Sequence, residues 1–171
     1  MKQSLNGIWR LYGADDKLKY DLKAKVPGSL YYTLMKYGLM KGPYYRENEY
    51  KATDISRGDC VYERRFPLTE EMLSAETLLL KFHGIDTIAD IFLNGELLGR
   101  AENMHREYVF DITGKANETD NLLEVKIYSP IKYIEEKNAE TPLWGVASTM
   151  AGYPHIRKAH YMFGWDWGAH L

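Results

Sequence analysis

One carboxylate between two tryptophans is the stretch of this 171-residue chain with the clearest chemical potential. Trp165, Asp166 and Trp167 stand between two glycines, Gly164 and Gly168. In an extended backbone, the period of two sends both indoles to one face and the carboxylate to the other, and the glycines permit sharp bends. An indole can cover the C–H face of a sugar, and a carboxylate can accept hydrogen bonds from neighbouring hydroxyls. Spacing alone favours the commoner role of alternate tryptophans, which is to fill the core of a β-sandwich.

The remaining sequence contains no motif for catalysis or cofactor binding. It lacks the patterns of serine hydrolases, zinc proteases, phosphate-binding glycine loops and zinc ribbons. His155 and His160 have no third ligand at metal spacing. The adjacent carboxylates of Glu70-Glu71 and Glu135-Glu136 diverge on a helix or strand, so they make a poor acid and nucleophile pair. We therefore expect no catalytic residue, no metal and no cofactor in this chain.

The elements that would position the tryptophan stretch are mostly short strands. The clearest is a hairpin in which Thr87–Leu93 and Glu96–Arg100 flank Asn94-Gly95, a dipeptide that favours a type I′ turn. Alternating, β-branched or aromatic residues predict further strands, which are Ile8–Tyr12, Val61–Phe66, Thr77–Phe82, Tyr108–Ile112 and Leu122–Tyr128. This succession indicates an all-β fold, an antiparallel β-sandwich.

Helices should be few and short. Ser29 can cap a helix that contains Leu30, Leu34 and Tyr37 at helical spacing and stops at Gly38. One more helical turn is expected after Thr69. The stretch from residue 39 to 57 has no clear periodicity and is interpreted as a long surface connection. We therefore expect one or two short helices.

The overall composition of the chain limits its possible partners and its cellular location. The length supports one domain, and a formal net charge of −2 without basic clusters argues against nucleic acid. No run is apolar and long enough to cross a membrane, and no apolar signal region is present near Met1. Cys60 is the only cysteine, which suits a reducing compartment. Together these features predict a cytoplasmic protein, in which the sequon at Asn117 is a chance match.

The ordered motifs of the chain resemble one known family. Arg157–Ala159, Tyr161, Phe163 and Gly164–Gly168 are similar to the signature that closes the N-terminal domain of β-mannosidases of glycoside hydrolase family 2. Other segments resemble that domain in the same order, and they are Val26–Ser29, Pro43–Tyr45, Glu47–Glu49, Gly84–Asp90, Leu93–Gly95 and Asn103–Arg106. Ala169 and Cys60 depart from the usual pattern, which has proline and an aromatic residue at these positions.

The resemblance implies a galactose-binding-like jelly roll over residues 1–171 and a sugar-binding role. Asp166 would bind hydroxyls of a terminal, non-reducing β-D-mannose, while Trp167 and Trp165 would line or brace the subsite. A retaining glycosidase needs two carboxylic residues on a (β/α)8 barrel, and a barrel takes about 250 residues. The expected partners are therefore a β-mannoside sugar and a catalytic barrel of the same polypeptide that this chain does not contain.

The resemblance also implies one more strand after the tryptophan stretch. Without it, one sheet should expose unpaired backbone groups and an apolar strip, so we expect possible self-association of this chain.

Two other functions remain open from the sequence. The first is an autonomous carbohydrate-binding module, which would bind sugar without a second domain. The second is the same domain of another family 2 enzyme that acts on a different β-linked sugar, because the sandwich does not itself select the substrate.

Overall fold

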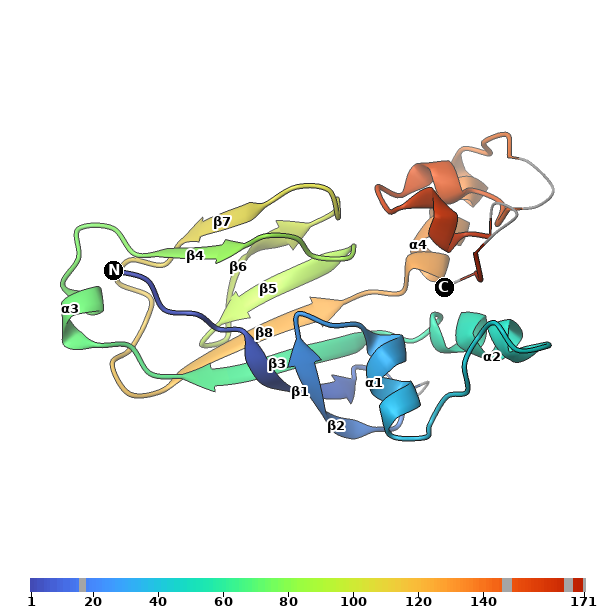
Figure 1. Cartoon of the computed structure of the whole chain (residues 1–171). Coiled ribbons are helices and arrows are strands. Elements are labelled where there is room, and N and C mark those ends of the chain that lie inside the picture. Colours follow the sequence, from blue (N-terminus) through green and yellow to red (C-terminus); the bar gives the residue numbers. More distant parts are fainter. Residues whose placement is uncertain (16–17, 146–148, 165–167, 171) are drawn as a thin grey trace.

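Two antiparallel sheets form the framework of the chain in the computed structural model, which describes residues 1–15, 18–145, 149–164 and 168–170. The larger sheet has the strand order β2-β1-β3-β8-β5-β6, and β4 pairs with β7 in the smaller one (Figure 1). The bounds are β1 Gly7–Gly13, β2 Asp21–Val26, β3 Cys60–Phe66, β4 Leu79–Phe82, β5 Ala89–Leu93, β6 Glu96–Ala101, β7 Tyr108–Asp111 and β8 Asn121–Ile127. The predicted antiparallel β-sandwich is confirmed.

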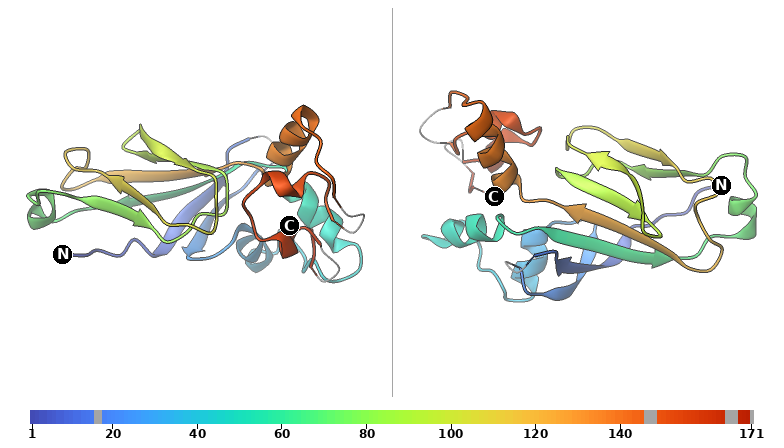
Figure 2. Two further views of the ribbon diagram at one scale, coloured as in Figure 1. Left: turned by 90° about the horizontal axis from the view of Figure 1, so that it is seen from above. Right: turned by 180° about the vertical axis from the view of Figure 1, so that it is seen from behind.

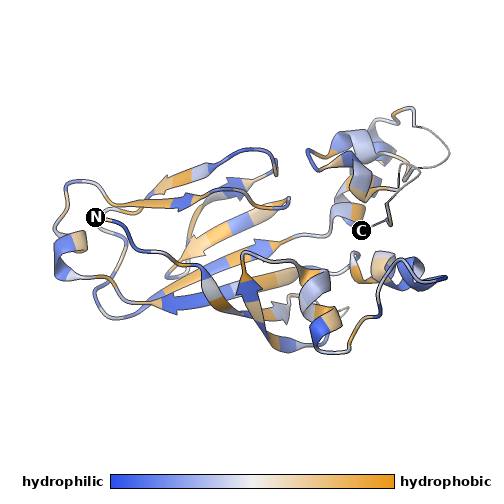
Figure 3. Ribbon diagram, viewed as in Figure 1, coloured by the Kyte–Doolittle hydropathy of each residue, from blue (hydrophilic) through white to orange (hydrophobic). Residues whose placement is uncertain are grey.

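Alternating burial explains why these segments become strands. Along β5, Ala89, Ile91 and Leu93 are buried, and their neighbours are only partly covered. Ile91 lies opposite Val125 of β8, and Leu93 lies opposite Leu123. The alternation of apolar and polar residues is visible along the strands in Figure 3. Strand β5 therefore turns one face to the core, where burial of apolar area stabilises the fold.

The hairpin between β5 and β6 has the turn that its sequence predicts. Asn94 and Gly95 have φ angles of 53° and 83°, as a type I′ turn requires. The register shifts between Ile91 and Phe92, which face Gly99 and Leu97, so Leu98 is the extra residue and the irregularity lies in β6.

The helical content is greater than the one or two short helices expected. The helices are α1 Leu30–Lys36, α2 Asn48–Ile55, α3 Glu70–Leu73 and α4 Pro130–Glu140, with 3₁₀ turns η1 Tyr153–His155 and η2 His160–Met162. The predicted cap of α1 is confirmed, because the hydroxyl of Ser29 accepts a hydrogen bond from the amide of Tyr32. The helical turn expected after Thr69 is α3, which the hydroxyl of Thr69 caps by accepting a hydrogen bond from the amide of Met72. Gly38 follows α1 with a φ of 70°.

Three elements differ from the sequence-based expectation. The predicted surface connection over residues 39–57 contains α2, which has a weak apolar face and buries only Ala52. Strand β2 was not predicted, and neither was α4. The signal for α4 is Ser129 followed by Pro130, with Ile131 and Ile134 buried three residues apart.

The helices α1, α2 and α4 gather at one end of the sandwich, together with residues 149–164 and 168–170. The views in Figure 2 agree with Figure 1 that the N-terminus lies at the opposite end, near α3. None of the described helices has the length and apolar character needed to span a membrane. At this end, two segments that resemble β-mannosidases meet, because the amide of Met104 donates to the carbonyl of Arg157.

Candidate functional site

The backbone around the tryptophan stretch is closed by a hydrogen bond between its two glycines. Trp165, Asp166 and Trp167 themselves lie outside the described residues. The amide of Gly168 donates to the carbonyl oxygen of Gly164 at 2.8 Å. The two ends of the stretch are therefore held side by side, and we call residues 164–168 the glycine-closed segment.

Each glycine of this segment has a separate steric reason to be there. Gly164 has a φ of 95°, a conformation that side-chain-bearing residues rarely adopt. A Cβ added to Gly168 would lie 2.2 Å from the carbonyl oxygen of Tyr161, so no larger residue fits without a backbone shift. The sequence-based prediction that both glycines permit sharp bends agrees with this geometry.

An apolar anchor fixes the chain immediately before the segment. Phe163 is 1% exposed and packs in a cluster with Ile88, Ile134 and Ile156. Ile134 comes from α4, whose first turn is capped by the hydroxyl of Ser129. The tight packing of such clusters resists displacement, so Phe163 fixes the start of the segment against α4 and the β4–β5 connection.

Backbone pairing fixes the chain on both sides of the segment. Gly164 pairs with Thr149, and Phe163 pairs with His170, in two isolated antiparallel bridges. The hydroxyl of Thr53 on α2 lies 2.9 Å from the carbonyl oxygen of His170. The glycine-closed segment is thus tied to α2 as well as to α4.

A third anchor lies further upstream, where residues 157–159 meet the loop after β6. The amide of Met104 donates to the carbonyl of Arg157 at 3.0 Å, and the amide of Ala159 donates to the sulfur of Met104 at 3.0 Å. The loop is itself fixed by the hydroxyl of Tyr108, which accepts the amides of Glu102 and Asn103 at 3.0 and 2.8 Å. Two segments that resemble β-mannosidases separately in sequence are therefore in direct contact.

A charged contact joins the same region to the β4–β5 connection. The ammonium of Lys158 lies 2.6 Å from a carboxylate oxygen of Asp86. The side chain of Lys158 is 6% exposed and that of Asp86 is 35% exposed. Sequence reasoning assigned no role to either residue, because the pair joins positions 72 residues apart and nothing in the local sequence signals the contact.

A cleft of about 290 Å³ opens beside this ion pair, between the larger sheet and β4. Its surface is mainly apolar and aromatic, and its lining includes Trp9, Leu30, Tyr31, Cys60, Tyr62, Phe82, Ile85, Asp86, Val125, Ile127, Tyr128, Lys158 and Met162. Burial raises the pKa of the Tyr31 hydroxyl and of the Cys60 thiol to about 12 each. These two groups therefore stay un-ionised near neutral pH.

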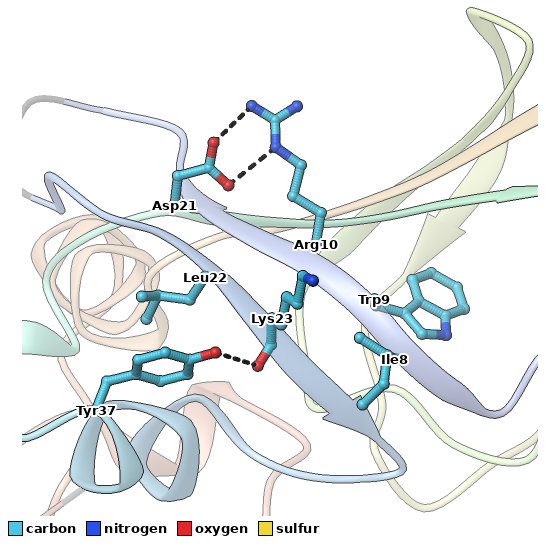
Figure 4. A pocket seen from close by; sticks show the side chains of 7 residues that line it. All are labelled: Ile8, Trp9, Arg10, Asp21, Leu22, Lys23 and Tyr37. Atoms are coloured by element: carbon cyan, nitrogen blue, oxygen red, sulfur yellow. Dashed lines mark hydrogen bonds and ion pairs between the residues drawn. The ribbon is translucent and has the colours of Figure 1, made fainter.

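A second hollow, of about 540 Å³, lies on the outer side of the β1–β2 hairpin beside α1 (Figure 4). Two pairs of its polar groups bind each other. The guanidinium of Arg10 donates to both carboxylate oxygens of Asp21 at 3.0 and 2.9 Å, and the hydroxyl of Tyr37 donates to the carbonyl of Lys23 at 3.4 Å. Polar groups that are already paired offer little to a ligand, so this hollow is a weaker candidate site.

The described residues offer no place for a metal ion. No group of three histidine, cysteine, aspartate or glutamate side chains comes together within residues 1–15, 18–145, 149–164 and 168–170. The structure therefore adds no metal candidate to the sequence-based expectation.

Comparison with known proteins gives one family. Residues 9–171 match the family described as glycosyl hydrolase 2 galactose-binding domain-like. Among curated relatives, the β-mannosidase of Bos taurus is 34% identical over 96% of this chain and 19% of its own length. The β-mannosidase of Mus musculus is 32% identical over the same shares. The chain therefore spans only 19% of the length of these relatives.

Solved structures show the same likeness. The β-D-mannosidase from Dictyoglomus thermophilum superimposes with a TM-score of 0.91 and 35% identity, over 100% of this chain and 21% of that protein. A β-glucuronidase from Bifidobacterium dentium superimposes with a TM-score of 0.53 and 24% identity, over 72% of this chain and 19% of that protein. At this identity the likeness shows the fold alone.

Proposed function

The chain belongs to the glycosyl hydrolase 2 galactose-binding domain-like family, and from this premise we propose that it is the sugar-binding domain of a β-mannosidase. In this role it supplies part of the wall of a sugar subsite, and a catalytic domain on the same polypeptide completes the site. The enzyme would release terminal, non-reducing β-D-mannose. The likeness to β-mannosidases from animals and from Dictyoglomus thermophilum supports this substrate.

One structural observation carries the proposal, which is the anchoring of the glycine-closed segment from three directions. Phe163 packs against α4, Thr53 of α2 binds His170, and Met104 binds the backbone of residues 157–159. A tryptophan stretch that served only to fill a core would need no closed backbone loop and no separate anchors on each side. Rigid support of this kind is what a binding residue needs, because its geometry must be set before the sugar arrives.

The chemistry follows from the residue types in the segment. Asp166 would accept hydrogen bonds from two neighbouring hydroxyls of the mannose, and Trp167 and Trp165 would line or brace the subsite. These roles rest on sequence resemblance, since the three residues lie outside the described part of the chain.

The catalytic pair would come from the other domain. Retaining glycosidases need a nucleophile and an acid/base whose carboxyl groups are about 5–5.5 Å apart. Around the cleft, the hydroxyl of Tyr31 and the thiol of Cys60 have pKa values of about 12. Neither group is a carboxylic acid of the kind that this mechanism needs, which is consistent with a division of labour between two domains.

The experiment compares the 171-residue chain with the longer polypeptide that carries it, using aryl β-mannoside, aryl β-glucuronide and aryl β-galactoside as substrates. We expect hydrolysis of the β-mannoside by the longer polypeptide and none by the chain alone. If the longer polypeptide prefers another of these β-glycosides, its substrate is that of a different family 2 enzyme and the proposed β-mannoside is wrong. Calorimetry with free mannose is the second measurement, and binding at millimolar concentration or better by the chain alone would favour an autonomous carbohydrate-binding module.

A further inference from the structure

The ion pair between Asp86 and Lys158 is unusual in its burial. Other ion pairs of the described residues, such as Arg65–Asp120 and Lys115–Glu96, join side chains that are more than one third exposed. Lys158 is 6% exposed, and lysine is almost never buried to this extent without a partner. Its ammonium would be strongly disfavoured in this place without the carboxylate of Asp86.

The location of the pair links it to the glycine-closed segment. Lys158 precedes Phe163 by only one 3₁₀ turn, η2, and its neighbours Arg157 and Ala159 are bound to Met104. On the other side, Asp86 is separated by one residue from Ile88, which packs against Phe163. The same short stretch of the β4–β5 connection therefore holds the chain at two points, by charge at Lys158 and by apolar contact at Phe163.

From this geometry we propose that Asp86 and Lys158 are positioning residues that set where the glycine-closed segment lies relative to the sandwich. The apolar cluster around Phe163 resists separation, but apolar contacts are non-directional and tolerate sliding. A charge-assisted hydrogen bond at 2.6 Å has a preferred direction and length, so it fixes the register of residues 157–164 along the β4–β5 connection. Neither residue is assigned contact with the sugar. Only the expected effect on catalysis rests on the proposed function, whereas the structural role of the ion pair does not.

Because the two partners are unequally exposed, the two single variants should differ in their effects. Asp86→Asn leaves a buried ammonium opposite a neutral amide, whereas Lys158→Met leaves a carboxylate that is 35% exposed and that water can reach. We therefore expect Asp86→Asn to be the more disruptive change. The double variant Asp86→Asn/Lys158→Met should resemble Lys158→Met, because it removes the orphaned charge.

The first measurement is hydrogen exchange at the amide of Gly168 in the 171-residue chain, which reports the closure onto Gly164. We expect faster exchange in Asp86→Asn and Lys158→Met, and near-normal exchange in Lys158→Arg, which keeps the charge. Arg65→Met is the matched control, because Arg65 forms a 2.6 Å ion pair with Asp120 at the other end of β3 and β8. Unchanged exchange in both site variants overturns the proposal. If Asp86→Asn does not fold, Lys158→Met and the double variant carry the test.

The second measurement is kinetics of the longer enzyme on an aryl β-mannoside. Misplacement of a binding group by about 1 Å costs on the order of 100-fold in rate, so kcat/KM should fall by about 10- to 100-fold in Lys158→Met and recover in part in Lys158→Arg. Leu123→Ala, a change in the sandwich core, should lower the melting temperature but keep near-normal kinetics in its folded fraction. Equal kinetic loss in Leu123→Ala would overturn the positioning role. If the wild-type enzyme does not act on β-mannosides, the proposed function fails, and the exchange at Gly168 still decides the positioning role.

Discussion

The hydroxyl of Thr53 lies 2.9 Å from the carbonyl oxygen of His170, so α2 holds a residue that follows it by 117 positions. The same hydroxyl lies 2.9 Å from the carbonyl oxygen of Glu49 within α2. A single side chain therefore connects a helix near the middle of the chain with the backbone just beyond the glycine-closed segment. This contact gives α2 a role in the candidate site that its weak apolar face would not suggest.

Thr53→Val tests this connection. Valine keeps the shape of threonine but removes the single hydroxyl proton that the carbonyls of Glu49 and His170 share, and one hydrogen bond contributes about 0.5–1.5 kcal/mol. We expect a loss of that size in the free energy of unfolding and faster amide exchange over residues 168–170. Thr53→Ser keeps the hydroxyl and should change both quantities much less. Equal effects of the two variants would assign the loss to packing of the methyl group.

Gly168→Ala tests the need for glycine at the end of the closed segment. The added methyl group would meet the carbonyl oxygen of Tyr161 at 2.2 Å, and relief of such crowding costs about 1–3 kcal/mol. Thermal melts of the 171-residue chain should show this loss. Gly42→Ala is the control, since a Cβ there meets no atom within 4 Å and should be neutral or slightly stabilising. A Gly168→Ala variant as stable as Gly42→Ala would show that the backbone moves aside freely.

Asp166→Asn tests the proposed sugar contact in the longer enzyme. The change keeps the shape of the side chain and removes its charge, and hydrogen bonds to charged groups are worth about 1.5–3 kcal/mol. Catalytic efficiency on an aryl β-mannoside should therefore fall by about 10- to 150-fold, with little change in melting temperature. A large fall in melting temperature with unchanged efficiency would instead make Asp166 a structural residue.

The ion pair between α4 and the chain before β3 predicts a pH dependence of stability. Arg57 donates to both carboxylate oxygens of Glu135, at 2.9 and 2.7 Å, and these hydrogen bonds hold the pKa of Glu135 below its ordinary value of 4.5. Because the folded pKa is lowered, the contribution is complete above the unfolded pKa. It is lost as the pH falls through the folded pKa.

The size of this contribution should be small. The side chain of Glu135 is 55% exposed, and exposed pairs contribute about 0.2–1 kcal/mol. Glu135→Gln should lower stability to urea at neutral pH by this amount, and its difference from wild type should shrink in acid. Glu136→Gln, which changes a neighbouring exposed carboxylate outside this pair, is the control. A difference that stays constant with pH would show that the ion pair does not carry the effect.

The outer edge of β4 offers a place for the predicted self-association. Within the described residues, β4 pairs only with β7, and the mainly apolar cleft lies beside β4. We expect dimers or larger species to increase with concentration in sedimentation experiments, through pairing at this edge. Leu79→Lys, a change at an exposed position of β4, should weaken the association, whereas Leu97→Lys on β6 should not. A monomer at all concentrations would contradict the prediction.

The strands and caps that were predictable from sequence are those whose residues have strong local conformational preferences. Asn94-Gly95 specifies its turn, Ser29 and Thr69 specify helix starts, and alternation specifies β5 and β8. Strand β2 has the sequence DLKAKV, in which Leu22, Ala24 and Val26 alternate with polar residues and which pairs with β1. This alternation is a strand signal that the sequence-based prediction missed.

The candidate site was predictable only in part. The two glycines are visible as neighbours of the tryptophan stretch, and their conformational role follows from residue type. The contacts that hold the segment join Thr53 to His170, Met104 to Ala159 and Asp86 to Lys158. Asp86, Met104, Lys158 and Ala159 stand in segments that resemble the family, but each contact joins positions far apart in the chain, so the local sequence does not show which residue meets which.

Strand β8 lies between two groups of strands that the ribosome synthesises before it. The larger sheet has β2, β1 and β3 on one side of β8 and the β5–β6 hairpin on the other. Until residue 127 has left the ribosome, these groups cannot be joined, and β3 and β5 each present an open edge. Chains grow at about 5–20 residues per second, so these edges stay exposed for seconds on the nascent chain. We expect the nascent chain to become resistant to protease in one late step, when β8 inserts between β3 and β5.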